Sequence, residues 1–341
     1  MKVLFIHSNQ PDYLAESLFH GLRTLLGKNC VDVPRYDSMY APLTDRIKSK
    51  LRGNGFTLYG LLEDIPELAE ERYFWRKDLA NYDLVVIGHI WWQWELVWKL
   101  LSLVDSEKIV ILDGWDTPVI FPYTSGLINR PWSYLTPVSR FKYFKRELME
   151  GGQHYGFAKF IPHCLRKQIT LPQNVYPISF SIPDQKICKV SIKGKEKDFP
   201  KHIVDPEIAA QVNESFFSSI GSDRLFFVSE EDYYNDLKKS RFGITTKRGG
   251  WDCLRHYELA ANGCVLCFKN IDLKPEKCAP HGLNDSNCIT YHSFKELKEK
   301  LFYISPNDYC YLQNMSYKWI KNNTTKARAR DFLAACNLPI R

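Results

Sequence analysis

One segment of the sequence combines cations, glycines and carboxylates at a spacing that suits the binding of a phosphate group. The segment reads Lys247-Arg248-Gly249-Gly250-Trp251-Asp252-Cys253-Leu254-Arg255-His256-Tyr257-Glu258 and closes at Asn262-Gly263. The free amides at the start of a helix, together with Lys and Arg side chains, attract phosphate. Glu258, one to two helical turns further on, would accept hydrogen bonds from two ribose hydroxyls. We therefore predict a cradle for a nucleoside diphosphate, formed by Lys247, Arg248, Gly249, Gly250, Trp251, Asp252, Arg255 and Glu258.

The same segment predicts a loop that runs into a short helix. Asp252 would be the N-cap of this helix, because its carboxylate can accept from the free amides of the first turn. Gly263 would follow the last turn, since glycine adopts the left-handed conformation without strain. The helical period gives an apolar face of Leu254, Tyr257 and Ala261, and a polar face of Arg255, Glu258 and Asn262. The alternative interpretation is an ordinary amphipathic helix with an Arg255–Glu258 pair on its solvated side.

Polar residues also follow the predicted strands in the first half of the chain. Ligands of open α/β sheets bind at the carboxyl ends of the strands, so His89 and Asp113 are candidate catalytic residues. Either would act as a general base or bind an acceptor hydroxyl. The loop Ser8-Asn9-Gln10 would line the same cleft. Helix capping and turn formation are the alternative role, which we favour for Asp116 before Thr117-Pro118.

Composition limits the class of protein without selecting a ligand. The 341 residues suggest about two domains, and 45% hydrophobic with 25% charged residues is typical of globular proteins. The net charge of +7 suits an anionic ligand, an anionic membrane surface or nucleic acid. Ten cysteines without paired spacing favour a reducing compartment. Cys264 and Cys267 lie three apart in a predicted strand and point to opposite faces, so we interpret them as core residues.

No apolar run is long enough for a signal peptide or a membrane span. We therefore expect a soluble, cytoplasmic protein that contacts a membrane at most peripherally.

The predicted elements form two parallel α/β units. A strand at 3–6, a helix at 13–26 and a strand at 31–33 make a βαβ opening. This opening lacks G-x-G-x-x-G, which argues against a nicotinamide enzyme. Further strands are expected at 82–88, 109–112, 177–183, 225–228, 242–245 and 265–268, with helices near 206–219, 231–239 and 293–301. Residues 41–80 are charged and look helical, and we assign them no role. Residues 184–201 are the most basic stretch, which we interpret as a solvated hinge or edge strand.

The sequence predicts two Rossmann-like domains without the G-x-G-x-x-G motif, and a strand–loop–helix with a carboxylate late in the chain. This arrangement resembles the GT-B fold of glycosyltransferases. Residues 240–264 resemble the nucleotide-sugar-binding segment of exostosin-like and spore-maturation-protein-like glycosyltransferases, R-x-G-x-D-x-x-R-x-x-E-x-x-x-x-G, which runs here from Arg248 to Gly263. Residues 143–147 and 177–182 are also similar to the end of the first domain in that family. The resemblance is specific over about residues 225–270 and topological elsewhere.

The resemblance implies roles for the motif residues and a division of the chain. In that family the Glu that matches Glu258 binds the donor ribose, and residues that match Arg248 to Asp252 lie near the diphosphate. We expect an acceptor-side domain at 1–183, a nucleotide-sugar-binding domain at 184–325, and a final helix at 326–341 that packs back on the first domain. The loop after the first strand lacks the glycine pair of many members, so no acceptor-side residue is carried over.

The expected function is a glycosyltransferase, a hexosyl- or pentosyltransferase, that moves a sugar from a nucleotide-sugar donor to a hydroxyl in the interdomain cleft. No Asp-x-Asp motif ends a strand, so we expect neither an essential metal nor a cofactor besides the donor. The cations would stabilise the departing diphosphate. An inverting reaction requires a base, for which Asp113 and His89 are the candidates, whereas a retaining reaction does not.

The sequence leaves two questions open, namely the acceptor and whether the protein is an enzyme or a binding protein. The acceptor would be a surface polysaccharide or a lipid-linked glycan, with a modified DNA base as the alternative. A non-enzymatic GT-B-like protein that binds a glycan or nucleic acid is the competing class.

Overall fold

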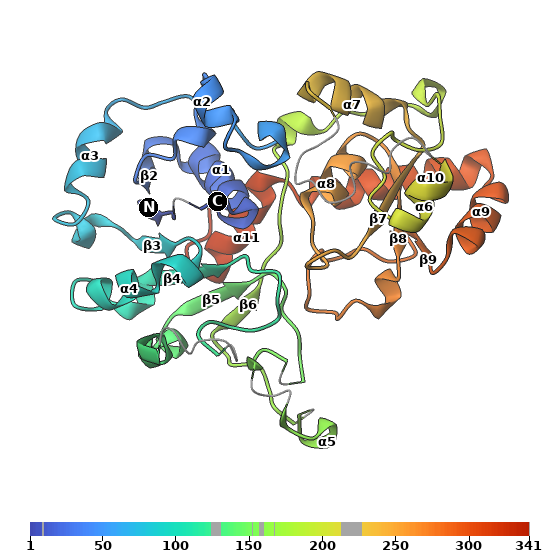
Figure 1. Ribbon diagram of the computed structural model, residues 1–341. Coiled ribbons are helices and arrows are strands. Elements are labelled where there is room, and N and C mark those ends of the chain that lie inside the picture. Colours follow the sequence, from blue (N-terminus) through green and yellow to red (C-terminus); the bar gives the residue numbers. More distant parts are fainter. Residues whose placement is uncertain are drawn as a thin grey trace.

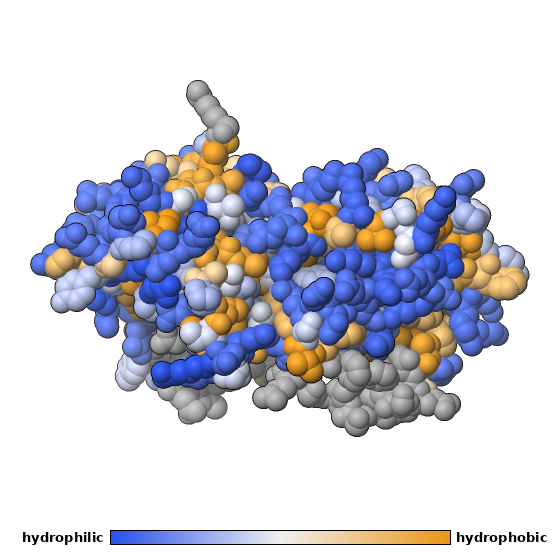
Figure 2. Space-filling view, turned by 90° about the horizontal axis from the view of Figure 1, so that it is seen from above, coloured by the Kyte–Doolittle hydropathy of each residue, from blue (hydrophilic) through white to orange (hydrophobic). Residues whose placement is uncertain are grey.

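The computed structural model describes residues 1–340 apart from 9, 124–130, 152, 157–159, 167 and 213–226. Within these residues the chain forms two parallel sheets flanked by helices (Figure 1). Figure 2, which views the molecule from above, shows two lobes side by side with mostly hydrophilic residues on this face.

The first sheet has six parallel strands in the order β2-β1-β3-β4-β5-β6. Their bounds are β1 Val3–Ile6, β2 Cys30–Val33, β3 Leu84–Ile87, β4 Ile109–Asp113, β5 Lys142–Lys145 and β6 Val175–Pro177. Val3 of β1, the second strand from one edge, pairs with Cys30 on one side and Leu84 on the other. Strands β1, β3 and β4 are short, almost entirely apolar runs buried on both faces, as is usual for parallel sheets covered by helices.

Helices cover both faces of this sheet. Helix α1 (Tyr13–Leu26) lies on one face and begins at Asp12, whose carboxylate accepts from the Leu14 amide at 2.9 Å. Helices α3 (Leu68–Phe74) and α4 (Ile90–Leu101) pack on the other face. Between β2 and β3 the chain is mostly irregular, with only α2 (Asp45–Lys48) and α3 as α-helices, so the helical prediction for residues 41–80 was largely wrong.

The second sheet contains β7 (Phe242–Thr246), β8 (Val265–Lys269) and β9 (Cys288–Tyr291), all parallel. Around it lie α6 Pro206–Val212, α7 Glu230–Lys239, α8 Leu254–Ala261, α9 Phe294–Phe302 and α10 Pro306–Lys321. A further short helix, α5 (His163–Arg166), projects from the first lobe (Figure 1). The strand expected at 225–228 falls partly outside the described residues, as does the end of the helix expected at 206–219.

The chain crosses between the two sheets twice. The first crossing, residues 178–183, lies outside both sheets, although the Ile178 amide donates to the Lys145 carbonyl of β5 at 3.2 Å, so the strand expected at 177–183 is wrong beyond Pro177. The second crossing lies at residues 322–324. The crossings run side by side, because the Ile182 amide donates to Asn323 (3.2 Å) and Ile182 accepts from the Thr325 amide (2.9 Å).

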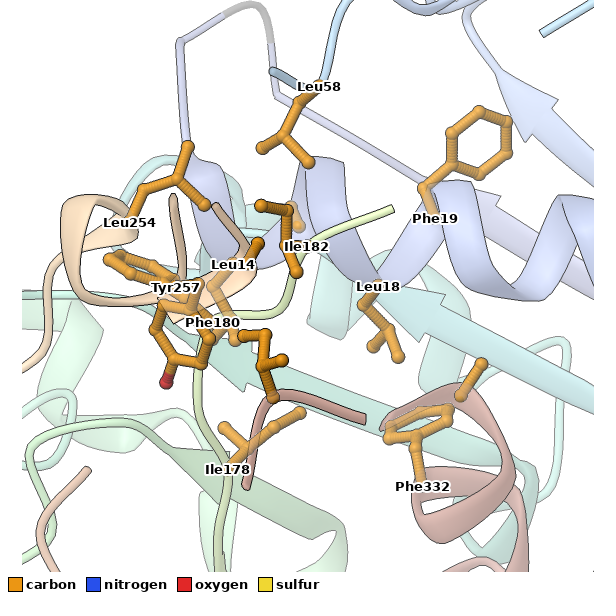
Figure 3. Close-up of a cluster of buried hydrophobic side chains, with 14 of the residues drawn as sticks. Leu14, Leu18, Phe19, Leu58, Ile178, Phe180, Ile182, Leu254, Tyr257 and Phe332 are labelled. Carbon is orange, nitrogen blue, oxygen red and sulfur yellow. The ribbon is translucent and has the colours of Figure 1, made fainter. Parts of the chain in front are cut away.

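The last helix, α11 (Thr325–Ala335), packs against α1 of the first sheet (Figure 1). A Cβ on Gly21 would lie 2.0 Å from the Thr325 carbonyl oxygen, so the two helices meet through a glycine. Figure 3 shows Phe332 of α11 near Leu18 and Ile178, in a buried cluster that also contains Leu254 and Tyr257 of α8. One apolar core therefore continues from the first sheet to α8. The division of the chain at residue 183 stays a prediction.

Candidate functional site

A cleft of about 1200 Å³ lies between the two sheets, at the carboxyl ends of their strands. Loops after β1, β3 and β4 form one wall, and loops after β7 and β8 form the other. This is the edge where open parallel sheets bind ligands. The lining includes nine residues predicted from sequence, namely Gln10, His89, Lys247, Arg248, Gly249, Gly250, Asp252, Arg255 and Glu258.

Three predicted residues are placed differently, and a fourth is not described. Ser8, Asp113 and Trp251 are absent from the described lining of the cleft. Asn9 lies outside the described residues. Trp251 is 6% exposed and packs against Phe268, while the Lys247 ammonium lies 5.2 Å from the centre of its ring. Trp251 thus supports the loop from behind.

Glu258 is a buried carboxylate at the end of the cleft. It accepts hydrogen bonds from the Thr57 hydroxyl and, at 2.6 Å, from the Tyr233 hydroxyl. Burial raises the pKa of Glu258, and the two hydroxyl donors oppose that shift. Thr57 comes from the segment after β2 that received no role, and its hydroxyl also lies 2.8 Å from that of Tyr234. The alternative of a solvated α8 face is therefore wrong at Glu258.

The ends of α8 agree with the sequence prediction only in part. Gly263 has a φ of 75°, as expected for the residue after the last turn, and Leu254, Tyr257 and Ala261 are buried. The N-cap is Cys253, without a side-chain cap, so the N-cap prediction for Asp252 was wrong. The Asp252 carboxylate instead accepts from the Phe180 amide (2.8 Å) and the Tyr257 hydroxyl (2.9 Å). Burial raises the pKa of Asp252 to about 6.

The Gly249-Gly250 turn is packed against carboxylates of the first lobe. A Cβ on Gly250 would lie 2.3 Å from Glu147 Oε1, and one on Gly249 would lie 2.8 Å from Asp116 Oδ2. The amides of Trp251 and Asp252 donate to Glu147 at 3.0 and 3.1 Å. These two amides of the predicted cradle are therefore already paired inside the protein, and the glycines are explained by this close approach.

Arg146 joins these carboxylates into one buried group. Its guanidinium is fully buried, pairs with Glu147 at 2.7 Å and with Asp116, and donates to the Asp252 carbonyl at 2.9 Å. Residues of the loop after β5 thus hold the start of α8. Asp116 has this ion-pairing role in place of the turn or cap that we favoured from sequence.

The wall formed by the second sheet carries more cations than carboxylates, which are Asp205, Asp252 and Glu258. Its cations are Lys201, Lys247, Arg248, Arg255 and Lys269. Lys247 and Arg248 are exposed, whereas Nε of Arg255 is buried without a hydrogen-bond partner among the described residues. His202 lies on the same wall, and burial, with the nearby Arg255 and Arg248 charges, lowers its pKa to about 4. Such a wall suits a polyanionic ligand such as a diphosphate.

The opposite wall is aromatic. His89 has a left-handed backbone (φ 60°), and its ring meets the edges or faces of Trp92 and Trp115 at centroid distances of 6.2 and 5.9 Å. Nδ1 of His89 is buried without a hydrogen-bond partner among the described residues. His89 therefore has hydrogen-bonding capacity that the protein leaves unused.

Asp113 is a fully buried carboxylate behind this wall. It pairs with Lys145 Nζ at 2.9 Å and accepts from Trp91 Nε1 and the Trp115 amide, each at 3.0 Å, and from the Tyr143 hydroxyl. Burial, with the Asp113 charge beside it, raises the pKa of Tyr143 well above its usual value. With its oxygens engaged by these donors, Asp113 is placed to position Trp91 and Trp115.

Several lining residues were missed by sequence reasoning. They are Tyr13, Arg52, Trp92, Trp115, Lys201, His202 and Lys269. The signal for Trp92 and Trp115 was present, because both follow strand ends as His89 and Asp113 do. No comparable signal pointed to Arg52 or to Thr57, which lie in an irregular segment.

The described residues contain no helix long and apolar enough to cross a membrane. Among the same residues, no three His, Cys, Asp or Glu side chains are grouped to hold a metal ion. The predicted independence from a metal stays a prediction.

Comparison with known proteins identifies the fold. No known family and no curated protein matches the sequence. HepE of Anabaena, solved in complex with UDP, is similar in structure with a TM-score of 0.54 and 10% identity, over 99% of this chain and 100% of that one. An alpha-glucosyltransferase in complex with UDP-glucose and DNA containing an abasic site has a TM-score of 0.55 and 11% identity, over 99% of both chains. The trehalose-6-phosphate synthase OtsA has a TM-score of 0.51 and 11% identity, over 99% of this chain and 100% of its own.

These similar structures are GT-B glycosyltransferases with two Rossmann-like domains, and the chain has this fold, as expected from sequence. The finer resemblance to the exostosin-like and spore-maturation-protein-like proteins stays a prediction.

Proposed function

We propose that the protein is a glycosyltransferase that moves a sugar from a nucleotide-sugar donor to an acceptor hydroxyl in the cleft between its two sheets. One observation carries the proposal. A cationic wall and a buried carboxylate line the same cleft as a histidine with an unpaired ring nitrogen. Solved proteins of this fold bind UDP or UDP-glucose, which supports a nucleotide-sugar as the ligand.

The diphosphate would lie against the start of α8. Cys253, the N-cap, has no side-chain cap, and the His256 amide donates to the Cys253 carbonyl at 3.0 Å, so the amides of Leu254 and Arg255 are the ones that would bind an anion. Arg248 and Arg255 line the cleft at this point, and the buried Nε of Arg255 would gain a partner from a phosphate oxygen. These positive groups would stabilise the charge on the departing diphosphate, so the proposed reaction uses no metal.

The ribose would bind at Glu258. A carboxylate has two oxygens, which match a vicinal pair of hydroxyls, and both Glu258 oxygens already accept from hydroxyl groups. Thr57 and Tyr233 occupy the positions that ribose hydroxyls would share or take. Donor binding would therefore exchange one set of hydroxyl donors for another at the same carboxylate.

His89 is the residue that we assign to the acceptor. In an inverting transfer it would take the proton of the attacking hydroxyl, and in a retaining transfer it would orient that hydroxyl. Asp113 is left out of this role, because it is fully buried and its carboxylate is engaged with Lys145 and Tyr143. A cytoplasmic location, with peripheral contact to a membrane that supplies a lipid-linked acceptor, is part of the proposal.

A thermal-shift screen tests the proposal directly. UDP-, GDP- and ADP-glucose are added to the purified protein in the presence of EDTA, and release of nucleoside diphosphate is then measured with the donor that binds. A donor at a hundred times its Kd should stabilise the folded state by about 2.7 kcal/mol. A melting temperature that none of the three donors raises would remove the proposal. A donor that binds but is never hydrolysed or transferred would favour the binding-protein alternative.

A further inference from the structure

The first-lobe wall of the cleft carries an aromatic cluster that donor binding does not use. The cluster consists of Trp92, His89 and Trp115, which we call the aromatic wall. Trp92 is 50% exposed and Trp115 is 39% exposed, although both lie inside the cleft. Large aromatic side chains usually bury most of their surface, so two exposed indoles in a concave site indicate a platform for a ligand.

The aromatic wall is held in place by contacts behind it. Asp113 accepts from the Trp115 amide and from the Trp91 indole, and the Trp91 and Trp115 rings are 5.3 Å apart. Gln93 donates to the Gly88 carbonyl at the end of β3, just before His89. The Trp115 indole is therefore preorganised, which lowers the entropic cost of binding a ligand against it.

The charge of the first-lobe lining favours a sugar over a nucleic acid as the ligand of the aromatic wall. Among the described lining residues of the first lobe, Arg52 is the one Lys or Arg, and it is accompanied by Asp12 and Asp116. Proteins that stack bases on aromatic rings combine those rings with a positively charged groove along the phosphates. The cations of this cleft line the opposite wall. An uncharged ring with an apolar face, as in a pyranose, matches the aromatic wall better than a polyanion.

We infer that the acceptor is an uncharged carbohydrate whose ring stacks on Trp92 and Trp115 and whose hydroxyl bonds to His89. The inference rests on the proposed function and names its acceptor class. Trp115 precedes Asp116, whose carboxylate lies against Gly249 of the donor wall. The acceptor platform is therefore adjacent to the predicted position of the diphosphate.

Saturation-transfer NMR tests the inference with the full-length protein and four methyl glycosides, those of glucose, galactose, mannose and N-acetylglucosamine. We expect at least one glycoside to bind, and Trp92→Ala and Trp115→Ala to weaken it by about tenfold, since one stacked ring contributes on this order. Trp92→Phe should retain most of the affinity. Trp98→Ala is the matched control, because Trp98 lies on the same helix, is 43% exposed and is absent from the described lining.

The outcomes distinguish this inference from the proposed function. Binding of no glycoside, or an equal loss in Trp98→Ala, would overturn the inference. So would salt-sensitive binding of a twelve-nucleotide oligothymidylate that Trp92→Ala abolishes, because that result would assign the wall to nucleic acid. The thermal shift induced by whichever of UDP-, GDP- and ADP-glucose binds, measured on the same variants, should be unchanged in Trp92→Ala. Absence of that shift in the wild-type protein would contradict the proposed donor site. Binding of the glycosides would still decide whether the aromatic wall binds a carbohydrate.

Discussion

The two walls of the cleft differ in how their residues are distributed along the chain. Most of the cationic wall comes from one continuous stretch, residues 246–258, around a single loop and helix. The aromatic wall is assembled from the ends of β3 and β4, which are separate in sequence and adjacent only in the sheet. A site built on one local segment leaves a motif in the sequence, whereas a site built across strands leaves scattered residues.

The comparison also shows that the cationic wall depends on the first lobe. Glu147 is 1% exposed and accepts from Arg146, from the amides of Trp251 and Asp252, and from the Cys278 thiol. Replacing Glu147 with Ala should lower the free energy of unfolding by about 3–5 kcal/mol, because it removes one partner of a buried ion pair. Urea denaturation measures this loss.

Glu150→Ala is the matched control for that substitution. Glu150 is an exposed glutamate three residues further on, paired with Lys277, and its loss should not measurably change stability. Glu147→Gln keeps the chain length and one acceptor oxygen, so its loss should be intermediate. Equal stability of Glu147→Ala and Glu150→Ala would show that the first lobe does not hold the donor loop.

A second prediction is that the two walls bind different ligands. Glu258→Ala should weaken donor binding by about 100-fold or more, since each charge-assisted hydrogen bond to a ribose hydroxyl contributes about 1.5–3 kcal/mol. Binding of the methyl glycoside should stay unchanged. Calorimetry with the donor that emerges from the thermal-shift screen measures the first affinity, and saturation-transfer NMR measures the second. Unchanged donor affinity in this variant would remove Glu258 from the site.

A third prediction concerns pH. The folded-state pKa of Asp252 is raised by burial to about 6, from an ordinary value of 3.8. The folded protein therefore binds more protons than the unfolded chain between about pH 4 and 6, so this group's contribution to stability falls as the pH rises through that window. The size is roughly 2–3 kcal/mol at one pKa unit per 1.36 kcal/mol.

The measurement for Asp252 is a difference between two proteins. The urea midpoints of wild type and Asp252→Asn are compared from pH 4 to 6.5, so that other titrating groups cancel. We expect the wild-type protein to lose stability relative to the variant as the pH rises. A difference that is constant across the window, or that grows in favour of wild type, would contradict the raised pKa.

The smallest expected effect is at Thr57, where the first lobe contacts Glu258, the carboxylate that we propose binds the donor ribose. Thr57→Val keeps the shape and removes the hydroxyl that donates to Glu258. Without that competing donor, affinity for the nucleotide-sugar should rise by about a few-fold, because part of one hydrogen bond to Glu258 no longer has to be exchanged. Thr57→Ser retains the hydroxyl and should bind as wild type does. A weaker affinity in Thr57→Val would instead show that Thr57 contacts the donor.

The sequence predicted local features well and long-range partners poorly. The order of the parallel units, the start and end of β1, and the burial of Tyr257 follow from apolar periodicity, which depends on neighbouring residues. Asp252 was expected to cap α8, yet its partner is the amide of Phe180 in the first crossing. Asp113 was expected to face a ligand, yet its carboxylate forms an ion pair with Lys145 on the adjacent strand. No local pattern contains either partner, so these two roles required the structure.

The paired crossings between the lobes have a mechanical consequence. A single peptide link would let one lobe swivel, twist and shift against the other. Here two links lie side by side and are joined by backbone hydrogen bonds at Ile182, and α11 anchors the second link on α1. Such a strip bends about one line and resists torsion. Two links joined in this way oppose rotation of one lobe about the other more than a single link would.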